Sequence, residues 1–410
     1  MRCLLWGTTA ISSPPVDLLY TDAERAFRDE LREWLQDVLP SIGRQPDTSD
    51  FAAKREFDTA WQRTLYDAGY AGINWPREFG GRGATPTEQL IFVEETERAR
   101  APYVGCNFVG LLHAGPTLIM EANDEQRAMH LPAILKGEHP WCQGFSEPGA
   151  GSDLASLQTR AYRDGDYYVV SGQKIWTSYA QIADYCELLV RTNADAPKHR
   201  GISWLIMPMD LPGLEVRPIR TAHGDSEFSE MFLDEVRIPV ANLVGAENDG
   251  WRVAMVTFSF ERGTAFISDV ISSAQDLRDL ADIARKVLRK GSSAWDDAEI
   301  RREVGRLQAD YDAMWALTKR NVSQAQRTGI VGPGGSVFKL FLADVQKRAT
   351  ALAYKLLGRM TTAYDDLGEM TDVDFAGDRV YVLTLSIAAG TSQIQRNIIG
   401  ERVLGLPKER

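Results

Sequence analysis

The hydrophobic period changes twice along this sequence, and these changes constrain the fold more than any other feature. The first third has apolar residues at the spacing of amphipathic helices, as at Phe27, Leu31 and Leu35. From about residue 140 the period becomes two residues, which is typical of strands, and after Pro239 it returns to the helical spacing. Strands and helices do not alternate, so a Rossmann domain is not indicated. We predict an α+β multidomain chain, with helical regions on both sides of a sheet-rich one.

Local signals define the elements in each region. Capping boxes at Thr21 with Glu24, and at Thr85 with Glu88, predict two helix starts in the first region. In the middle region, the turn residues Asp164 and Gly165 predict a β-hairpin. Four further strand candidates follow: 187–191, 202–207, 214–219 and 230–238. We expect a small antiparallel β-barrel or sandwich there. Four helical stretches, 251–265, 266–290, 338–360 and 380–401, together with a charged segment from Asp296, then predict a C-terminal four-helix bundle.

A length of 410 residues suits two or three domains. We predict an N-terminal helical domain at 21–137, a middle β domain at 138–245 and a C-terminal helical bundle at 246–410. Residues 1–20 are predicted to be a disordered leader, because the apolar run at Leu4, Leu5 and Trp6 is too short for a signal peptide.

Charge and cysteine content exclude several classes of function. The formal net charge is −11 and no dense Lys/Arg run occurs, which argues against nucleic acid or an anionic membrane as partner. The sequence contains no run of 18 or more apolar residues, so no membrane span is predicted. The four cysteines, Cys3, Cys106, Cys142 and Cys186, lack metal-ligand spacing. We therefore expect no metal site and a reducing, cytoplasmic location.

Three polar segments are candidates for binding a ligand. The first, 145–153, contains closely spaced glycines and two hydroxyls that suit the approach of backbone to a ligand. The second, 172–178, places Trp176 beside Thr177 and Ser178. The third, 390–397, has hydroxyl and amide side chains near a helix start. Each also has an ordinary interpretation on its own: a turn, a core tryptophan and a helix cap.

Taken together and in this order, the three segments resemble the acyl-CoA dehydrogenase family over residues 21–410, and the closing Arg402-Val403-Leu404-Gly405-Leu406-Pro407 is similar to its tail. The resemblance implies FAD as cofactor, an acyl-CoA substrate and an electron-transfer flavoprotein as electron acceptor. By position it implies FAD contacts at Phe145, Ser146, Gly151, Ser152, Trp176, Thr177 and Ser178. Thr391 and Gln393 are expected to reach FAD in the assembled oligomer.

The resemblance also implies the reaction, in which a carboxylate removes the α-proton of the acyl-CoA while the β-hydride goes to flavin N5, giving a trans-2-enoyl-CoA. Many members carry this carboxylate just before the Gly-Thr-Ser-Gln run, where this sequence has Ala389. Other members place it on a C-terminal helix immediately before an arginine. Glu261, followed by Arg262, occupies that position and is the candidate base. Arg262 is expected near the thioester or CoA end.

Ala389 leads to a hypothesis about the substrate. Alanine keeps the backbone N–H that would donate to the thioester carbonyl but removes side-chain bulk, which favours a branched, bulky or steroid-derived acyl group.

The motifs by which homotetrameric relatives reach a neighbour's FAD are absent at Leu288–Ser292 and at Leu356–Met360. The chain therefore resembles actinobacterial members that assemble as α2β2 heterotetramers with a paralogous chain, several of which act on steroid side chains. Two alternatives remain: a non-catalytic or half-site subunit, and a flavin monooxygenase relative.

Overall fold

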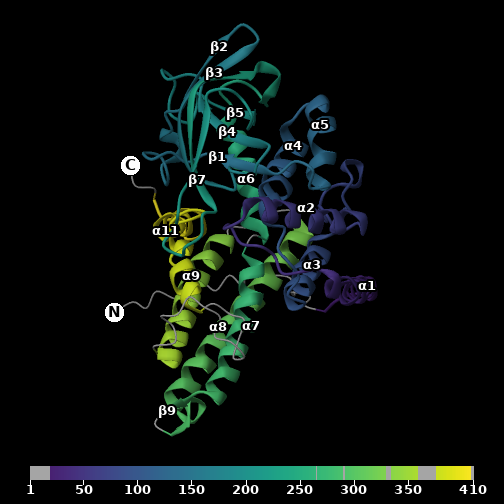
Figure 1. Cartoon of the computed structure of the whole chain (residues 1–410), viewed down its shortest axis with the longest axis vertical. Helices are drawn as coiled ribbons and strands as arrows, with labels where there is room; N and C mark the ends of the chain where they lie inside the picture. Colours follow the sequence, from purple (N-terminus) through teal and green to yellow (C-terminus); the bar gives the residue numbers. More distant parts are fainter. Residues whose placement is uncertain (1–18, 265, 290, 329–333, 359–374, 408–410) are drawn as a thin grey trace, which may run out of the picture.

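The computed structural model describes residues 19–264, 266–289, 291–328, 334–358 and 375–407, except for the side chains of 261–264, 328 and 375–376. The sheet lies at one end of the molecule, the C-terminal helices extend to the other end, and the N-terminal helices lie beside both (Figure 1). The order helical, sheet-rich, helical confirms the predicted α+β architecture. Of the predicted leader, only Leu19 and Tyr20 are within the described residues.

The N-terminal helices begin where the sequence predicted. Thr21 and Thr85 both form complete capping boxes, with Glu24 and Glu88 respectively. A third box, Asn123 with Gln126, begins another helix and has the same signature, but it was not predicted. The helices are α1 (Asp22–Val38), α2 (Phe51–Asp67), α3 (Pro86–Arg98), α4 (Gly115–Glu121) and α5 (Asp124–Leu135), with short turns of helix at Leu39–Ser41, Arg77–Phe79, Gly105–Asn107 and Gly110–Ala114.

An eight-stranded sheet forms the middle region. Its strand order is β6-β7-β3-β2-β4-β5-β8, and β1 pairs with β4. The predicted hairpin is β2 with β3, closed by Gly165 in the left-handed conformation at φ 61°. The strands are β1 (Trp141–Gly144), β2 (Arg160–Asp164), β3 (Tyr167–Ser178), β4 (Tyr185–Arg191), β5 (Ile202–Pro208), β6 (Leu214–Pro218), β7 (Phe228–Pro239) and β8 (Leu243–Val244).

The sheet is mixed rather than purely antiparallel. β1 runs parallel to β4, from Trp141 opposite Tyr185, and β2 meets β4 in parallel at Arg160 opposite Arg191. The other pairings in this sheet are antiparallel, as predicted. β1 was missed because its four residues directly after a helix are too few to show a strand period.

The two faces of the sheet belong to different cores. Leu189 and Ile206 on neighbouring strands pack into the cluster that includes Trp75 and Trp141 of the N-terminal region. The alternate residues, such as Leu188, pack with the hairpin on the other face. Successive side chains of β4 and β5 point to opposite faces of the sheet, and both faces are buried.

The C-terminal region is a bundle in which α7, α8 and α9 share one core. α10 and α11 pack on α9, while α6 packs on β5 and α4. The helices are α6 (Gly250–Thr264), α7 (Ile267–Lys286), α8 (Ala298–Thr328), α9 (Gly334–Leu357), α10 (Phe375–Tyr381) and α11 (Ser392–Ile398), with a small hairpin of β9 (Leu288–Arg289) and β10 (Ser292–Ser293).

The prediction of one helix over 380–401 was wrong. The segment contains the end of α10, a 3-10 turn at Thr384–Ser386, a loop, α11 and a π turn at Ile399–Val403. Ala389 (φ 49°) and Gly390 (φ 85°) adopt left-handed backbone conformations that no α-helix contains, and Thr391 then caps a new helix. The helical period continues across this break, which is why it predicted a single element.

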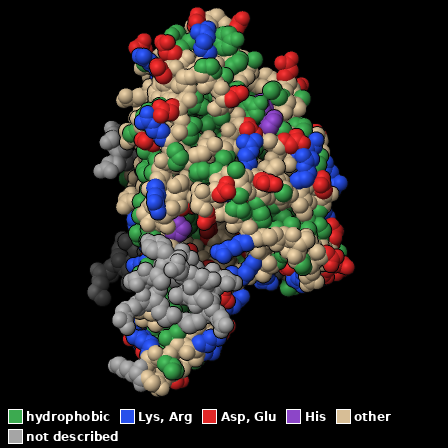
Figure 2. Space-filling model, viewed as in Figure 1, with side chains coloured by type: hydrophobic (Ala, Val, Ile, Leu, Met, Phe, Trp, Pro, Cys, Tyr) green, Lys and Arg blue, Asp and Glu red, His purple; other side chains and the backbone are tan. Residues whose placement is uncertain are grey.

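On the face shown in Figure 2, acidic and basic side chains are interspersed without a large area of one sign. Within the described residues, no helix combines the length and the apolar character needed to cross a membrane.

Candidate functional site

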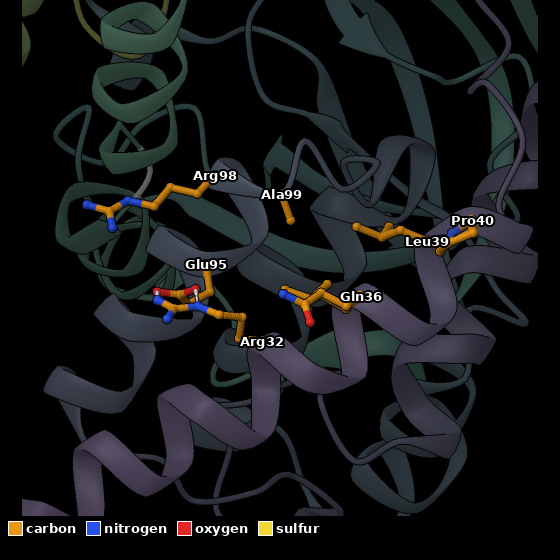
Figure 3. Close-up of a pocket in the computed structure, with 8 residues that line it drawn as sticks. Arg32, Gln36, Leu39, Pro40, Glu95, Arg98 and Ala99 are labelled. Atoms are coloured by element: carbon orange, nitrogen blue, oxygen red, sulfur yellow. Dashed lines mark hydrogen bonds and ion pairs between the residues drawn. The ribbon is translucent and has the colours of Figure 1, made fainter.

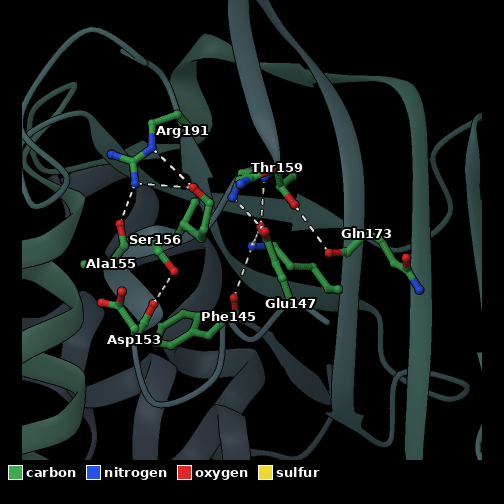
Figure 4. Close-up of polar contacts among 11 residues, drawn as sticks. Phe145, Glu147, Asp153, Ala155, Ser156, Thr159, Gln173 and Arg191 are labelled. Carbon is green, nitrogen blue, oxygen red and sulfur yellow. Dashed lines mark hydrogen bonds and ion pairs between the residues drawn. The ribbon is translucent and has the colours of Figure 1, made fainter. Parts of the chain in front are cut away.

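A buried charge holds the loop that follows β1, residues 145–153, against β3. The carboxylate of Glu147 accepts hydrogen bonds from the backbone N–H groups of Gln158 (2.6 Å) and Thr159 (2.8 Å) and from Lys174 Nζ (2.9 Å). Lys174 is fully buried and also donates to the Phe145 carbonyl at 3.1 Å (Figure 4). Burial alone would raise the pKa of Glu147, but Lys174 and the N–H donors hold it below its ordinary value.

The tip of the same loop is open. A Cβ added at Gly149 or Gly151 would meet no atom within 4 Å. Ser152 is exposed, and Asp153 forms a solvent-exposed ion pair with Lys198 at 2.7 Å. The base of the loop is therefore fixed by buried contacts, while its glycines leave backbone accessible to a ligand.

A bulge in β3 turns Trp176 outward. The register of β3 with β7 shifts between Lys174 and Thr177, and Trp176 has a φ of 64°. Its side chain is 56% exposed and contacts the ring of Phe228 edge-on, with centroids 6.0 Å apart. A tryptophan with a left-handed backbone is strained, and burial of its ring does not compensate the strain because the ring is exposed. Strain of this kind is typical of binding sites.

The structure brings the first two predicted segments together. The backbone N–H of Ile175 donates to the carbonyl of Ser146 at 3.0 Å, so Trp176, the next residue of β3, lies close to the loop. Thr177 differs from the others, because its side chain is fully buried and its hydroxyl makes no hydrogen bond within the described residues. Thr177 as a whole is therefore not exposed at the surface of the single chain.

The third segment is built differently. Thr391 accepts a hydrogen bond from Ile394 N at 3.2 Å as the cap of α11, and Gln393 is exposed. No hydrogen bond or ion pair between described residues joins Thr391 or Gln393 to the loop 145–153 or to β3. Within a single chain, the described contacts thus do not connect the third segment to the first two.

Two residues that the sequence did not suggest hold the loop 388–390. Lys339 donates to the carbonyls of Ala388 (2.8 Å) and Gly390 (2.6 Å), and Gln395 donates to that of Ala389 (3.0 Å). Burial, followed by the nearby charge of Lys347, lowers the pKa of Lys339 to about 8. The carbonyls of this loop thus point to donors, while among described residues the N–H groups of Ala389 and Gly390 make no hydrogen bond. No sequence signal identifies Lys339, since it lies 49 residues from the carbonyl that it contacts.

The backbone of Glu261 and Arg262 lies in the last turn of α6, and their side chains are outside the described residues. Phe258, one turn earlier on the same helix, contacts the ring of Phe145 with centroids 5.8 Å apart. The helix that carries the candidate base therefore packs on the loop 145–153.

Two cavities lie outside these segments. A groove of about 600 Å³ between α1 and α3 contains the ion pair of Arg32 with the buried Glu95, and none of the predicted site residues lines it (Figure 3). A smaller cavity of about 190 Å³ lies among α7, α8, α9 and α10. The groove is therefore separate from the candidate site.

Comparisons with known proteins identify the family of the chain. Models of the acyl-CoA dehydrogenase N-terminal, middle and C-terminal domains match residues 21–138, 142–236 and 248–404. The chain is 38% identical to the acyl-CoA dehydrogenase IpdE1 of Mycobacterium tuberculosis, covering 93% of this chain and 98% of that protein. It is 33% identical to FadE26, another acyl-CoA dehydrogenase of that organism, with 95% and 98% coverage.

Solved structures give the same result. A chain of the ChsE4-ChsE5 complex from Mycobacterium tuberculosis superposes with a TM-score of 0.81 at 33% identity, over 96% of this chain and 100% of that one. A chain of the Tcur3481-Tcur3483 steroid ACAD gives a TM-score of 0.83 at 29% identity, over 96% and 100%. The chain belongs to the acyl-CoA dehydrogenase family and is an oxidoreductase that acts on an acyl-CoA.

Proposed function

We propose that this protein catalyses the FAD-dependent α,β-dehydrogenation of an acyl-CoA to a trans-2-enoyl-CoA, with Glu261 as the base. The observation that carries the proposal is the loop 388–390. Lys339 and Gln395 occupy its carbonyl oxygens, which leaves the Ala389 N–H able to donate to the thioester carbonyl. Negative charge develops on that oxygen as the α-proton leaves, and a fixed donor there lowers the barrier.

The choice of base rests on the chemistry of the two family positions. Ala389 has no group that can take a proton, and Glu261 stands at the other position, on the helix that packs on the loop 145–153. Arg262 is assigned to the thioester or CoA end. A carboxylate that acts as general base contributes about 10² to 10⁴ in rate.

Glu261→Gln tests this assignment without a large change in side-chain volume. We expect acyl-CoA binding to persist while exchange of the α-proton with solvent deuterium falls by about 10² to 10⁴, as does flavin reduction. Binding is measured by calorimetry and exchange by mass spectrometry of the recovered thioester. Glu303→Gln, at a partly exposed position of α8, is the matched control. An unchanged exchange rate in Glu261→Gln would remove this residue from the mechanism.

The residues present fit FAD. Phe145, Ser146, Gly151 and Ser152 on the loop, with Trp176, Thr177 and Ser178 on β3, would hold it on the middle domain. The open glycines and the outward, strained Trp176 provide an accessible surface. Thr391 and Gln393 would contact the FAD of another subunit. Bound FAD supplies the redox chemistry by accepting the β-hydride at flavin N5. An electron-transfer flavoprotein is the proposed electron acceptor.

We also propose an α2β2 heterotetramer with a paralogous chain. Two of the structural neighbours are named as complexes of two chains, ChsE4-ChsE5 and Tcur3481-Tcur3483. On this chain, the segment around the third motif exposes large apolar side chains: Leu383 (50%), Ile387 (69%), Leu404 (65%) and Leu406 (57%). Such a surface is typical of one that another protein covers.

Co-expression with the paralogous chain from the same gene neighbourhood tests the assembly. We expect the two chains to co-purify with more FAD per subunit than this chain binds alone. Ile387→Ser should reduce recovery of the complex while changing the unfolding free energy of the single chain by less than about 0.5 kcal/mol. Tyr162→Ser, at an exposed position of the β2–β3 hairpin, is the control. Full FAD occupancy in the isolated chain would contradict the heteromer.

The small side chain of Ala389 supports a bulky, branched or steroid-derived acyl group. Rapid turnover of straight-chain acyl-CoAs, with none of bulky ones, would contradict this.

The alternatives remain a half-site subunit, which should lack any base, and a flavin monooxygenase relative, which should consume O₂ in step with substrate. The domain divisions at 137 and 245 and the cytoplasmic location remain predictions from the sequence.

A further inference from the structure

The cavity of about 190 Å³ among α7, α8, α9 and α10 is lined mainly by polar side chains. α7 contributes Asp269, Ser272, Ser273 and Asp276, α8 contributes Tyr311, α9 contributes Gln346 and Thr350, and α10 contributes Asp378 and Tyr381. Polar groups at this density in a helix bundle need partners. Two of these groups, Tyr311 and Asp269, lack such partners among the described residues.

Tyr311 is the clearest unsatisfied group. Its side chain is 1% exposed, it lines the cavity, and its hydroxyl makes no hydrogen bond within the described residues. Ser273 lies beside it, and the Ser273 hydroxyl accepts a hydrogen bond from Gln346 Nε2 at 2.7 Å. Leaving a buried hydroxyl unpaired costs about 1 to 3 kcal/mol, so a ligand in the cavity is expected to satisfy it.

Asp269 is the second polar group of interest in the cavity. It has no ion-pair partner among the described residues, and burial alone raises its pKa to about 6. Asp276 is partly compensated by Arg100, whose guanidinium lies 4.0 Å away. At neutral pH, Asp269 therefore offers a partly buried acceptor in the cavity that no cation of the described chain neutralises.

The position of the cavity connects it to the proposed reaction centre. Lys339, Gln346 and Thr350 are separated by seven and four residues, so they lie on one face of α9. Lys339 holds the loop 388–390, while Gln346 and Thr350 line the cavity, roughly 10 to 16 Å further along the helix axis. Asp269 and Asp276 lie on α7, the helix that directly follows the one carrying Glu261.

We propose that this cavity receives the far end of the acyl group and that this end carries a hydroxyl, which donates to Asp269 and accepts from Tyr311. The inference rests on the proposed function, because it places the thioester carbonyl at the Ala389 N–H. It adds a specificity site for an oxygenated, extended acyl group at a distance that a short acyl chain does not span.

Matched pairs of acyl-CoA thioesters test the inference: octanoyl-, decanoyl- and dodecanoyl-CoA, each against its ω-hydroxy counterpart. Binding to the full-length chain with its FAD and partner is measured by calorimetry. We expect the hydroxyl to improve affinity about tenfold at the length that reaches the cavity, with no gain at shorter lengths. Equal or weaker binding of the hydroxylated thioester at every length would overturn the proposal.

Tyr311→Phe separates ligand recognition from folding. The substitution removes only the unpaired hydroxyl, so the melting temperature should hold or rise while the hydroxyl preference disappears. Tyr167→Phe, on the β2–β3 hairpin, should keep the preference. A preference that survives Tyr311→Phe would overturn the assignment. Oxidation of the unsubstituted thioesters without any hydroxyl preference would refute only this inference, whereas failure to bind or oxidise any thioester would refute the proposed function as well.

Discussion

The loop 145–153 and the loop 388–390 are both fixed by a buried lysine, but they differ in what surrounds them. Lys174 pairs with a buried carboxylate and lies inside the sheet domain. Among the described residues, Lys339 donates hydrogen bonds only to backbone carbonyls, and its loop carries the exposed residues Ala388 and Ala389 on the outside. All the contacts described for the loop 145–153 come from its own chain. The loop 388–390 is positioned by the chain but left uncovered, which is what a subunit that shares its site with another would require.

Lys174→Met gives the largest expected effect. Glu147 would stay buried without its cation, which costs about 3 to 5 kcal/mol of unfolding free energy. Lys198→Met removes the exposed ion pair on the same loop and should cost less than about 1 kcal/mol. Urea denaturation of both variants measures the difference. Similar losses in the two variants would show that the buried pair does not fix the loop, and the comparison would fail.

Trp176→Gly probes the same half of the site with an intermediate effect. Glycine relieves a left-handed backbone strain of about 1 to 3 kcal/mol, so stability should hold or rise. Loss of the ring should weaken FAD binding by up to about tenfold. Fluorescence titration with FAD and thermal melts check the two expectations. Tyr162→Gly, an exposed aromatic elsewhere on the sheet, should leave FAD affinity unchanged.

Lys339→Met probes the other loop through the pH dependence of stability. The folded pKa of Lys339 is about 8, below the value of about 10.4 in unfolded chains. Between these values the unfolded chain holds a proton that the folded chain has released, so the contribution of this lysine to stability increases as pH rises from 8 to 10. Unfolding free energies of wild type and variant, measured at pH 7 to 10, should therefore diverge with increasing pH.

A constant difference between wild type and Lys339→Met across this range would contradict the buried environment of the lysine. Lys198→Met, at an exposed position, gives the background slope for loss of a lysine.

The sequence predicted the architecture because its signals are local. Capping at Thr21 and Thr85 and the Asp164-Gly165 turn each involve residues a few positions apart. The segments around Phe145 and Trp176 were found through the resemblance, and their contact follows from the pairing of Ile175 with Ser146.

What the sequence could not predict depends on distant contacts or on backbone conformation. The carbonyls that Lys339 holds lie about 50 positions further along, and the break at Ala389 lies in a continuous helical period. The outward turn of Trp176 arises from a bulge that only the pairing with β7 defines. The roles of Glu261 and Arg262 remain predictions, since their side chains are outside the described residues.

The parallel pairing of β1 with β4 has a consequence for synthesis of the chain. Trp141 aligns with Tyr185, so β1 leaves the ribosome well before its partner strand. Lys174, which neutralises Glu147, also follows the loop 145–153 in the sequence. We therefore expect this loop to stay unformed on the nascent chain until β4 has emerged, because non-local pairs form late. Cofactor loading would then be a late event in biogenesis, after the middle domain is complete, and a ribosome-stalled chain that ends before β4 should not retain FAD.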